Sequence, residues 1–377
     1  MPLYHTSAAS LGFCNCLVIG SAFLLGHKFS TRSFWPEVRA HNATIIQYVG
    51  ETCRYLLAAP PQYDPVTGAD LDSKNDVRLA FGNGLRPDIW DRFKQRFGIE
   101  TICEFYAATE SPSALFNTSS NNFSSGAVGR SGLLAASTMG AGLALVETDR
   151  ETERPTRCAE ANNHCVRVKP GEPGELIHKL DPADISRSFQ GYYGNAKATE
   201  SKILRDVFVK GDAWYQTGDR LRWDADGRWW FCDRIGDTFR WKSENVSTTE
   251  VSEALGMHPY INEANVYGVE LPHHDGRAGC AAVLLSRDLD QAMLDQVASH
   301  TKQSMPKYAV PLFLRIVSNI EATGTNKQQK HRLRAEGVDP GKVRDTQGDK
   351  IYWLKGGTYV EFGDADWEEM KAGRVKL

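Results

Sequence analysis

The sequence lacks a paired-cysteine motif, a long apolar segment and a clear excess of either charge. Its eight cysteines are spread along the chain without a CxxC pair, which favours free thiols in a reducing, intracellular compartment. The 44 Lys and Arg nearly balance the 47 Asp and Glu, so no global electrostatic attraction to nucleic acid is expected. An anionic ligand must therefore be bound by a local set of residues.

The longest apolar run covers residues 11–26, which is 16 residues including Asn15 and Ser21. A helix needs about 20 apolar residues to span a membrane, so we expect a buried helix followed by a buried strand. No basic segment precedes the run, and the sequence does not predict a cleaved secretory signal.

The pattern along the chain predicts an α/β fold. Helical patterns alternate with short apolar strands over residues 1–110, which is typical of an α/β sheet. The strands are expected at residues 22–25, 44–47, 77–81 and 101–105. Ile89, Trp90, Phe93 and Phe97 recur at helical spacing behind Pro87, which predicts an amphipathic helix packed on that sheet.

The remainder of the chain predicts a β-rich part and a small α+β domain. Short alternating strands are expected at residues 174–179 and 229–232. After Arg240 we expect helices at residues 249–255 and 288–304 and strands at residues 264–269 and 280–285. The predicted domains are residues 1–236, divided at residue 110 into an α/β part and a β-rich part, and residues 237–377.

Three motifs follow one another in a fixed order: FYAATE at residues 105–110, YQTGD at residues 215–219 and DRIGDTFRWKSENVST at residues 233–248. Together they resemble the adenylate-forming, AMP-binding superfamily. NGLRP at residues 83–87 and GDTFRWK at residues 236–242 resemble its fatty-acid transport protein and very-long-chain acyl-CoA synthetase family, in the fungal form. The resemblance covers essentially the whole chain. It implies a large AMP-binding domain and a mobile C-terminal domain.

Gly82, Asn83 and Gly84 directly follow an apolar strand. Residues without a Cβ let the backbone approach a flat ligand such as adenine. A plain turn between a strand and a helix is the structural alternative.

Tyr106, Thr109 and Glu110 follow another strand end, where open α/β sheets bind ligands. The resemblance implies that Tyr106 packs near the adenine, Thr109 contacts phosphate and Glu110 is a catalytic ligand of Mg²⁺. A carboxylate suits that hard cation. Taken alone, Glu110 is typical of a solvated loop.

Asp219 and Arg234 complete the nucleotide site that the resemblance implies. Asp219 would accept hydrogen bonds from both ribose hydroxyls, and Arg234 would join it at the ribose and phosphate edge. The structural alternatives are a common Gly-Asp turn and a surface ion pair.

Gly236 and Asp237 match the hinge at which the superfamily's C-terminal domain moves between two half-reactions. The next motif resembles the segment beside the CoA channel, with serine where glycine is usual. Its residues are Lys242, Ser243, Glu244 and Asn245.

Lys327 matches the catalytic lysine that stabilises charge developing during adenylation, and Lys330 is the nearby alternative. Tyr4 and His5 resemble positions beside the acyl-binding site, although a lone histidine is as often structural. The adjacent histidines His273 and His274 do not by themselves make a metal site, so a surface turn is expected there.

Related enzymes carry a phosphate loop upstream of a segment like PLYH at residues 2–5, and this sequence begins after it. Because that loop cradles phosphates with backbone N–H groups, we expect a truncated enzyme with weakened ATP binding. The predicted function is ATP- and Mg²⁺-dependent activation of long or very-long-chain fatty acids to acyl-CoA, in lipid metabolism and in fatty-acid uptake. The alternative is a catalytically impaired fragment or a non-enzymatic fatty-acid-binding or transport protein.

The expected partners are a fatty acid, ATP and CoA, without nucleic acid. Peripheral association with a peroxisome, endoplasmic reticulum or lipid-droplet membrane is the expected location. The C-terminal residues 375–377 (VKL) resemble a peroxisomal tripeptide, with valine in place of the usual small residue.

Overall fold

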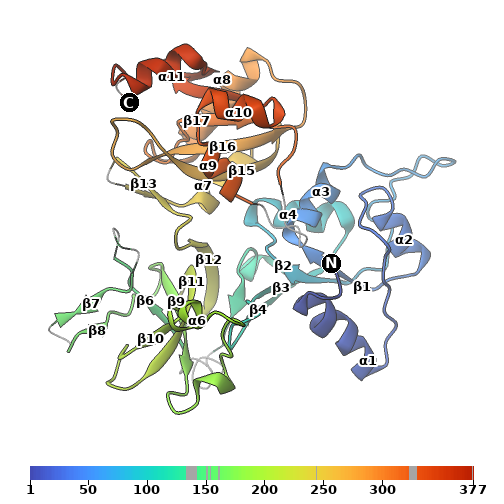
Figure 1. Ribbon diagram of the computed structural model, residues 1–377. Helices are drawn as coiled ribbons and strands as arrows, with labels where there is room; N and C mark the ends of the chain where they lie inside the picture. The colour runs from blue at the N-terminus through green and yellow to red at the C-terminus, as the bar shows by residue number, and fades with distance from the viewer. Residues whose placement is uncertain are drawn as a thin grey trace. The chain divides into compact units, whose positions relative to one another are not determined.

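The computed structural model describes residues 1–132, 142–149, 152, 154–159, 162–242, 244–321, 329–375 and 377. The chain divides into two compact units, Met1–Cys232 and Asp233–Leu377, which we call the large unit and the small unit. Figure 1 shows the large unit from blue to green-yellow and the small unit from yellow to red. Each unit is described by itself.

A four-stranded sheet forms the first part of the large unit (Figure 1). In spatial order its strands are β1 (Ile45–Val49), β2 (Leu79–Asn83), β3 (Thr101–Tyr106) and β4 (Leu115–Ser119). The first three strands are parallel, and β4 is antiparallel to β3. The predicted strands at residues 44–47, 77–81 and 101–105 are confirmed, with bounds shifted by one or two residues.

Two helices follow the first two strands of this sheet. α3 (Gly50–Ala58) follows β1, and α4 (Pro87–Phe97) follows β2. The buried face of α4 consists of the four residues that the periodicity predicts, Ile89, Trp90, Phe93 and Phe97. Because parallel strands end at the same edge of a sheet, the first residues of both helices lie at the edge where ligands bind in such folds.

The β-rich part of the large unit is a mostly antiparallel sheet. Its main path has the spatial order β5 (Gly129–Arg130), β12 (Arg228–Arg234), β11 (Ala213–Trp223), β9 (Gly174–Leu180) and β6 (Leu143–Val146). β10 (Ile203–Arg205) pairs with β11, and β7 (Arg157–Cys158) forms a hairpin with β8 (His164–Cys165). The pairing of β11 with β9 shifts register between Gln216 and Arg220. This irregularity lies in the YQTGD motif.

The large unit also contains short helical segments. They are α2 (Phe34–Ala40), η2 (Asn122–Ser124), η5 (Ile185–Arg187) and α6 (Ala196–Glu200).

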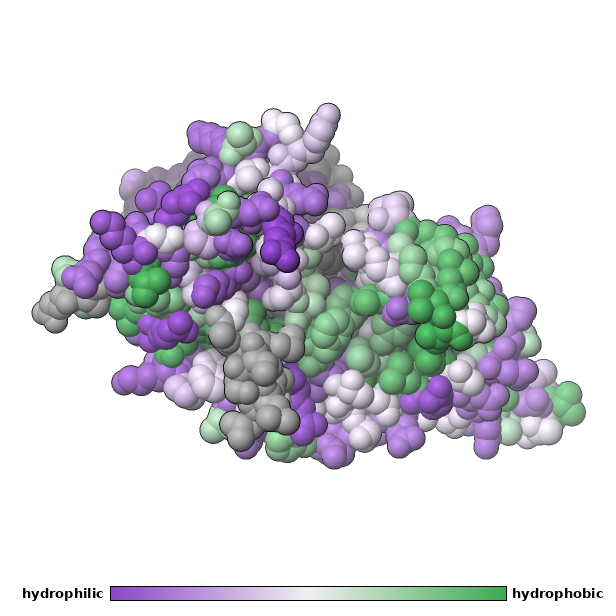
Figure 2. All heavy atoms as spheres, turned by 90° about the horizontal axis from the view of Figure 1, so that it is seen from below, coloured by the Kyte–Doolittle hydropathy of each residue, from purple (hydrophilic) through white to green (hydrophobic). Residues whose placement is uncertain are grey.

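The apolar run near the N-terminus differs from the prediction of a buried helix and a buried strand. It forms a π-helical segment η1 (Ser7–Cys14) and a short helix α1 (Asn15–Ile19) that buries none of its residues. Residues 22–25 form no strand. Val18 is 84% exposed and Ile19 is 74% exposed, and Figure 2 shows apolar residues gathered on this face.

The missing strand has a simple physical reason. A strand needs a neighbour that accepts and donates its backbone hydrogen bonds. Among the described residues, none pairs with residues 22–25, and β1 is the outermost strand of its sheet.

The small unit is an α+β fold around a five-stranded sheet. In spatial order the strands are β15 (Ile261–Glu270), β16 (Arg277–Leu285), β17 (Phe313–Ile316), β18 (Lys350–Lys355) and β19 (Thr358–Glu361). The helices are α7 (Thr248–Gly256), α8 (Gln291–Ser304), α9 (His331–Glu336), α10 (Pro340–Gln347) and α11 (Asp364–Lys371). A hairpin of β13 (Phe239–Trp241) and β14 (Glu244–Val246) precedes them. The elements predicted after Arg240 are confirmed, with longer strands.

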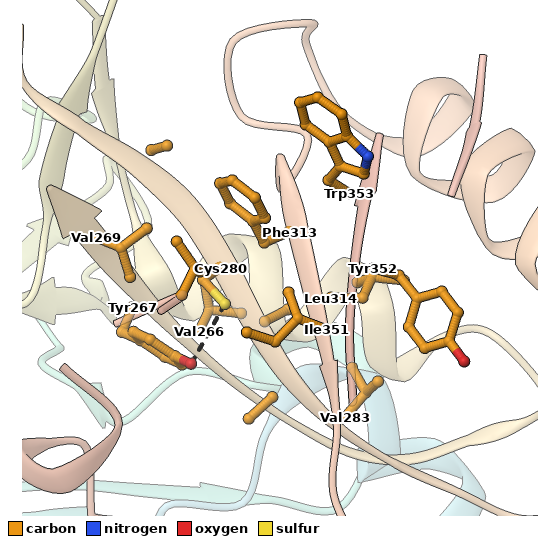
Figure 3. Packing of buried hydrophobic residues seen from close by; sticks show 14 of the residues in the cluster. Val266, Tyr267, Val269, Cys280, Val283, Phe313, Leu314, Ile351, Tyr352 and Trp353 are labelled. Atoms are coloured by element: carbon orange, nitrogen blue, oxygen red, sulfur yellow. Dashed lines mark hydrogen bonds between the residues drawn. The ribbon is translucent and has the colours of Figure 1, made fainter. Parts of the chain in front are cut away.

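Buried side chains from the sheet form the core of the small unit, and Figure 3 shows Tyr267, Cys280, Phe313 and Trp353 within it. The Cys280 thiol donates a hydrogen bond to the Tyr267 hydroxyl oxygen at 3.3 Å. Burial raises the pKa of Cys280 to about 12, so this thiol is protonated at neutral pH. The residue acts as a small apolar side chain.

Arg315 of β17 is a charged residue with no exposed side-chain area. Its guanidinium lies 2.7 Å from Asp349 and 2.6 Å from Glu336. The pKa of Arg315 is raised, because these two carboxylates and Tyr267 outweigh its burial. The cation thereby joins β17, α9 and the residue before β18.

All eight cysteines are free, and Cys14 is exposed rather than buried. Over the part of the chain that the structure describes, no helix is both long enough and apolar enough to cross a bilayer.

Candidate active site

Gly82, Asn83 and Gly84 lie where β2 ends, and their backbone is packed from two sides. A Cβ on Gly82 would lie 2.3 Å from the Tyr48 carbonyl oxygen, and a Cβ on Gly50 would lie 1.6 Å from the Gly84 carbonyl oxygen. Gly84 has a φ of 78°, a conformation that favours glycine. These contacts explain why the turn needs residues without side chains.

Asn83 carries a buried side-chain oxygen, Oδ1, that accepts no hydrogen bond from the described residues. A buried acceptor without a donor costs about 1–3 kcal/mol. The exocyclic amino group of adenine is a donor that this oxygen would suit. The orphaned acceptor therefore fits the adenine site that the sequence predicts.

Glu104 of β3 supports this turn from within the sheet. Its carboxylate, in a residue that is 1% exposed, accepts hydrogen bonds from the Tyr48 hydroxyl at 2.5 Å, from the Gly84 N–H and from the Leu85 N–H at 3.2 Å. Burial raises the pKa of Glu104 to about 8, although the three donors act in the opposite direction. Glu104 thus positions residues 82–85.

Tyr106 and Asp219 come from motifs that lie 113 residues apart, and the structure brings them together. The Tyr106 hydroxyl donates a hydrogen bond to Asp219 Oδ2 at 2.6 Å. Burial, followed by the negative charge of Asp219, raises the pKa of Tyr106. The strand end of β3 and the irregular part of β11 therefore form one locus.

Glu175 of β9 supports the residues just before Asp219. Its carboxylate is 1% exposed and accepts hydrogen bonds from Gln216 Nε2 at 3.0 Å and from the Gly218 N–H at 3.1 Å. Burial raises the pKa of Glu175. Glu175 thus positions the YQTGD turn, as Glu104 positions residues 82–85.

Glu110 and Thr109 follow Tyr106 in a turn, with Thr109 exposed and Glu110 half-buried. Glu110 Oε1 accepts a hydrogen bond from the Tyr192 hydroxyl at 3.0 Å. Across the described ranges, no group of three or more His, Cys, Asp or Glu side chains lies together as a metal site. A Mg²⁺ held by Glu110 would therefore take its other ligands from phosphate and water, as this cation commonly does.

His178 of β9 holds the segment that follows Glu110. Its Nδ1 lies 2.5 Å from the Ser113 hydroxyl oxygen. Burial lowers the pKa of His178 to about 4, so the ring is neutral at physiological pH and suits a hydroxyl partner.

The residues predicted beside the acyl site lie at the start of the large unit. Tyr4 is 80% exposed, and His5 is half-buried with its Nδ1 at 3.1 Å from the Ser7 hydroxyl oxygen. This contact by itself fits the structural alternative for His5.

The predicted hinge residues, Gly236 and Asp237, and the predicted CoA-channel residues lie in the small unit. We call residues 233–237 the connector. Arg234 is exposed, Gly236 has a φ of 86° and Lys242 has a φ of 52°. Asp237 forms ion pairs with Lys330 at 2.9 Å and with Arg334 at 2.7 Å.

Glu244 and Asn245 belong to β14, and Asn245 lines a cavity of about 140 Å³. Lys327 and Ser243 lie outside the described residues. His273 and His274 bond backbone carbonyl oxygens, as expected of a turn.

Comparison with known proteins decides the family. A profile described as AMP-binding enzyme matches residues 1–193, and one described as AMP-binding enzyme C-terminal domain matches residues 250–327. A very long-chain fatty acid transport protein of Cochliobolus heterostrophus is 42% identical over 100% of this chain and 57% of its own length. This chain belongs to the AMP-binding enzyme family.

Two further comparisons place the chain within that family. Isopenicillin N epimerase component 1 of Hapsidospora chrysogena is 41% identical over 98% of this chain and 60% of its own length. A solved anthranilate CoA ligase in complex with anthranoyl-AMP has a TM-score of 0.68 at 20% identity, covering 88% of this chain and 57% of that protein. The AMP-binding fold is therefore shown, and the chain spans little more than half the length of these proteins.

The sequence motifs do not include Glu104, Glu175 and His178, which support the segments of the candidate site. A signal was available for the two glutamates, because each is a carboxylate inside an apolar strand, in CEFY and in GELI. Buried carboxylates need dedicated donors, so such a position indicates a structural hydrogen-bond network. The sequence shows no comparable signal for His178.

Proposed function

We propose that this chain carries the adenylating half-site of an acid–CoA ligase that activates long or very-long-chain fatty acids. In the proposed reaction the fatty carboxylate attacks the α-phosphate of Mg·ATP and releases pyrophosphate. The CoA thiol then displaces AMP from the acyl-adenylate. The observation that supports this most directly is the hydrogen bond between Tyr106 and Asp219, which joins two motifs at one strand edge.

Each residue has a role that its chemistry allows. Asn83 would accept from adenine, Asp219 from the ribose hydroxyls, and Glu110 would hold Mg²⁺ beside the phosphates. The metal would neutralise phosphate charge while these residues orient the nucleotide. Arg234 and Lys327 would supply cations at the phosphates.

Fatty acids are proposed as substrates because relatives named fatty acid transport proteins align over the whole of this chain. The relative named isopenicillin N epimerase component 1 is about equally identical. That similarity favours a second candidate, a ligase for a carboxylic acid other than a fatty acid. A substrate panel should therefore include an aromatic and an amino-containing acid.

Peripheral membrane association and coupling to uptake belong to the same proposal, and the names of the transport-protein relatives support them. Flotation of the purified chain with anionic vesicles would measure the association. Recovery of the chain apart from the vesicles at low salt would contradict the proposed membrane association.

The decisive experiment measures acyl-CoA formation by the purified chain from ATP, Mg²⁺, CoA and a C16 or C24 acid. Asp219→Asn should lower activity and weaken binding of an alkyl ester of AMP by about tenfold, because it loses one charged acceptor. Asp226→Asn is the matched control, since Asp226 is an exposed aspartate in the turn between β11 and β12.

The outcomes separate the candidate functions. Fatty-acid binding without ATP turnover would favour the non-enzymatic alternative. Thioester from pre-made acyl-adenylate alone would limit the activity to the second half-reaction. Equal AMP-ester binding by wild type and Asp219→Asn would contradict the proposed nucleotide site.

A further inference from the structure

We propose that Lys330 is a positioning residue that, with Arg334, fixes the connector residue Asp237 to the small unit, and that Lys330 is not the lysine that stabilises charge during adenylation. The inference rests on the proposed function only for the role of the connector.

Both oxygens of the Asp237 carboxylate are bound by cations. Lys330 Nζ lies 2.9 Å from Oδ2, and an Arg334 Nη atom donates to Oδ1 at 2.7 Å. The three side chains are 20–33% exposed. Such half-buried, charge-assisted bonds are stronger than pairs on an open surface.

A second bond from Lys330 extends this arrangement to the start of α7. Lys330 Nζ donates to the Thr248 hydroxyl oxygen at 2.7 Å, and that hydroxyl lies 3.2 Å from Asp233 Oδ1. A hydroxyl has one proton and two acceptor sites, so Thr248 accepts from Lys330 and donates to Asp233. The Thr248 N–H also donates to Asp233, at 2.6 Å.

The connector is therefore attached to the small unit at both of its ends. Asp233 is 3% exposed and bound by Thr248, and Asp237 is bound by Lys330 and Arg334. Only residues 234–236 lie between these points. Residues 234–236 therefore form a short turn that is held at both ends within the small unit.

The same geometry distinguishes between the two candidate lysines. The ammonium group of Lys330 is already compensated by a carboxylate and a hydroxyl. A group that stabilises developing charge must direct its donors at the reacting atoms. Lys330 is directed at the connector, which leaves the catalytic role to Lys327.

Hydrogen exchange of the connector amides, followed by mass spectrometry on the full chain, tests the proposal without requiring catalysis. The reporter is the Asp237 N–H, which donates to the Arg234 carbonyl oxygen at 3.0 Å. Lys330→Met should speed exchange in residues 235–238 about tenfold, the effect of losing roughly 1.4 kcal/mol of local stability. Lys330→Arg should restore exchange to within about twofold of wild type, because the ion pair can form again.

Two further variants complete the design. Lys307→Met removes an exposed lysine of the same unit and should leave exchange unchanged. Asp237→Asn should reproduce the Lys330→Met effect, and the double variant should add little to it, since both changes break the same bond. This pair keeps the test valid if one variant folds poorly.

Unchanged exchange in both Lys330→Met and Asp237→Asn would overturn the proposal. Loss of adenylation in Lys330→Arg with a wild-type exchange pattern would also overturn it, because it would assign Lys330 to the chemistry. If the wild-type chain makes no adenylate while the variants show the expected exchange pattern, the proposed function is contradicted and this inference stands.

Discussion

Two sets of carboxylates, one at the candidate site of the large unit and one in the small unit, are held in opposite ways. In the large unit, Glu104 and Glu110 accept hydrogen bonds from tyrosine hydroxyls, and Glu175 accepts from an amide and a backbone N–H. In the small unit, Asp237 and Asp349 are paired with lysine or arginine.

The pKa shifts follow this difference. Burial raises the pKa of Glu104 and Glu175. Burial acts in the same direction on Asp237 and Glu336, but neighbouring cations outweigh it and lower both pKa values. With neutral donors, burial prevails and favours the protonated form of Glu104, whereas cations keep the Asp237 carboxylate ionised. The first arrangement supports the turns of the candidate site, and the second forms structural ion pairs.

The largest expected effect comes from removing the buried cation of the small unit. Arg315→Met removes the buried cation from Asp349 and leaves Glu336 paired only with Arg332, which should cost about 3–5 kcal/mol of unfolding free energy. Urea denaturation of the full chain followed by tryptophan fluorescence would measure it. Arg277→Met, which breaks an exposed pair with Glu270, should cost less than about 1 kcal/mol, and an equal loss in both variants would contradict the comparison.

A carboxylate-to-amide change in each unit sharpens the comparison. Asp349→Asn leaves Arg315 with one charged partner instead of two and should cost about 2–3 kcal/mol. Glu104→Gln keeps one acceptor for neutral donors and should cost about 1 kcal/mol. Chemical denaturation at pH 7 measures the free energy of unfolding of both variants. A larger loss in Glu104→Gln than in Asp349→Asn would contradict the comparison between carboxylates held by cations and those held by neutral donors.

The pH dependence should also differ between the units. A folded-state pKa of about 8 for Glu104 lies above the ordinary value of 4.5. Its contribution to stability is therefore present at low pH and is lost as pH rises toward 8, by an amount on the order of 2 kcal/mol between pH 6 and pH 8.

Asp237 has a lowered pKa, so its contribution is present above its ordinary pKa of 3.8 and is lost as pH falls through the lower folded value. The free energy of unfolding would be measured against pH for wild type, Glu104→Gln and Asp237→Asn. Each variant should lack the pH dependence that its replaced carboxyl causes in wild type. A wild-type slope between pH 6 and pH 8 that persists in Glu104→Gln would show that another group causes it.

The smallest effect is expected at Glu110, the residue proposed to bind magnesium. Tyr192→Phe removes the donor to Glu110 without moving its charge, so the affinity for Mg²⁺ in the presence of ATP should change by about twofold to fivefold. Titration calorimetry would measure this change. Glu110→Gln should weaken Mg²⁺ binding more strongly, and the opposite order would argue against Glu110 as the metal ligand.

Local pattern was enough to predict α4, because Ile89, Trp90, Phe93 and Phe97 all face the same core. The sequence was enough to place Tyr106 at a strand end, whereas Asp219 lies inside β11 beside a register shift that periodicity cannot show. Residues 22–25 were wrongly predicted as a strand because strand formation depends on a neighbour, which hydrophobicity does not report.

The supporting residues were harder to predict than the site itself. Glu104 and Glu175 act on backbone N–H groups of other segments, so no side chain at the receiving positions indicates the interaction. The pairing of Lys330 with Asp237 likewise needed coordinates, because several basic residues occupy the same stretch of the sequence.

The buried carboxyl of Glu104 would couple the proposed nucleotide binding to proton exchange. Because its pKa lies near 8, the solution at that pH contains chains with and without this proton. A ligand that shifts the Gly84 and Leu85 amides changes the ratio of the two forms and exchanges protons with the buffer. The heat of AMP-ester binding at pH 8 should therefore vary with the ionisation enthalpy of the buffer, and it should cease to vary in Glu104→Gln.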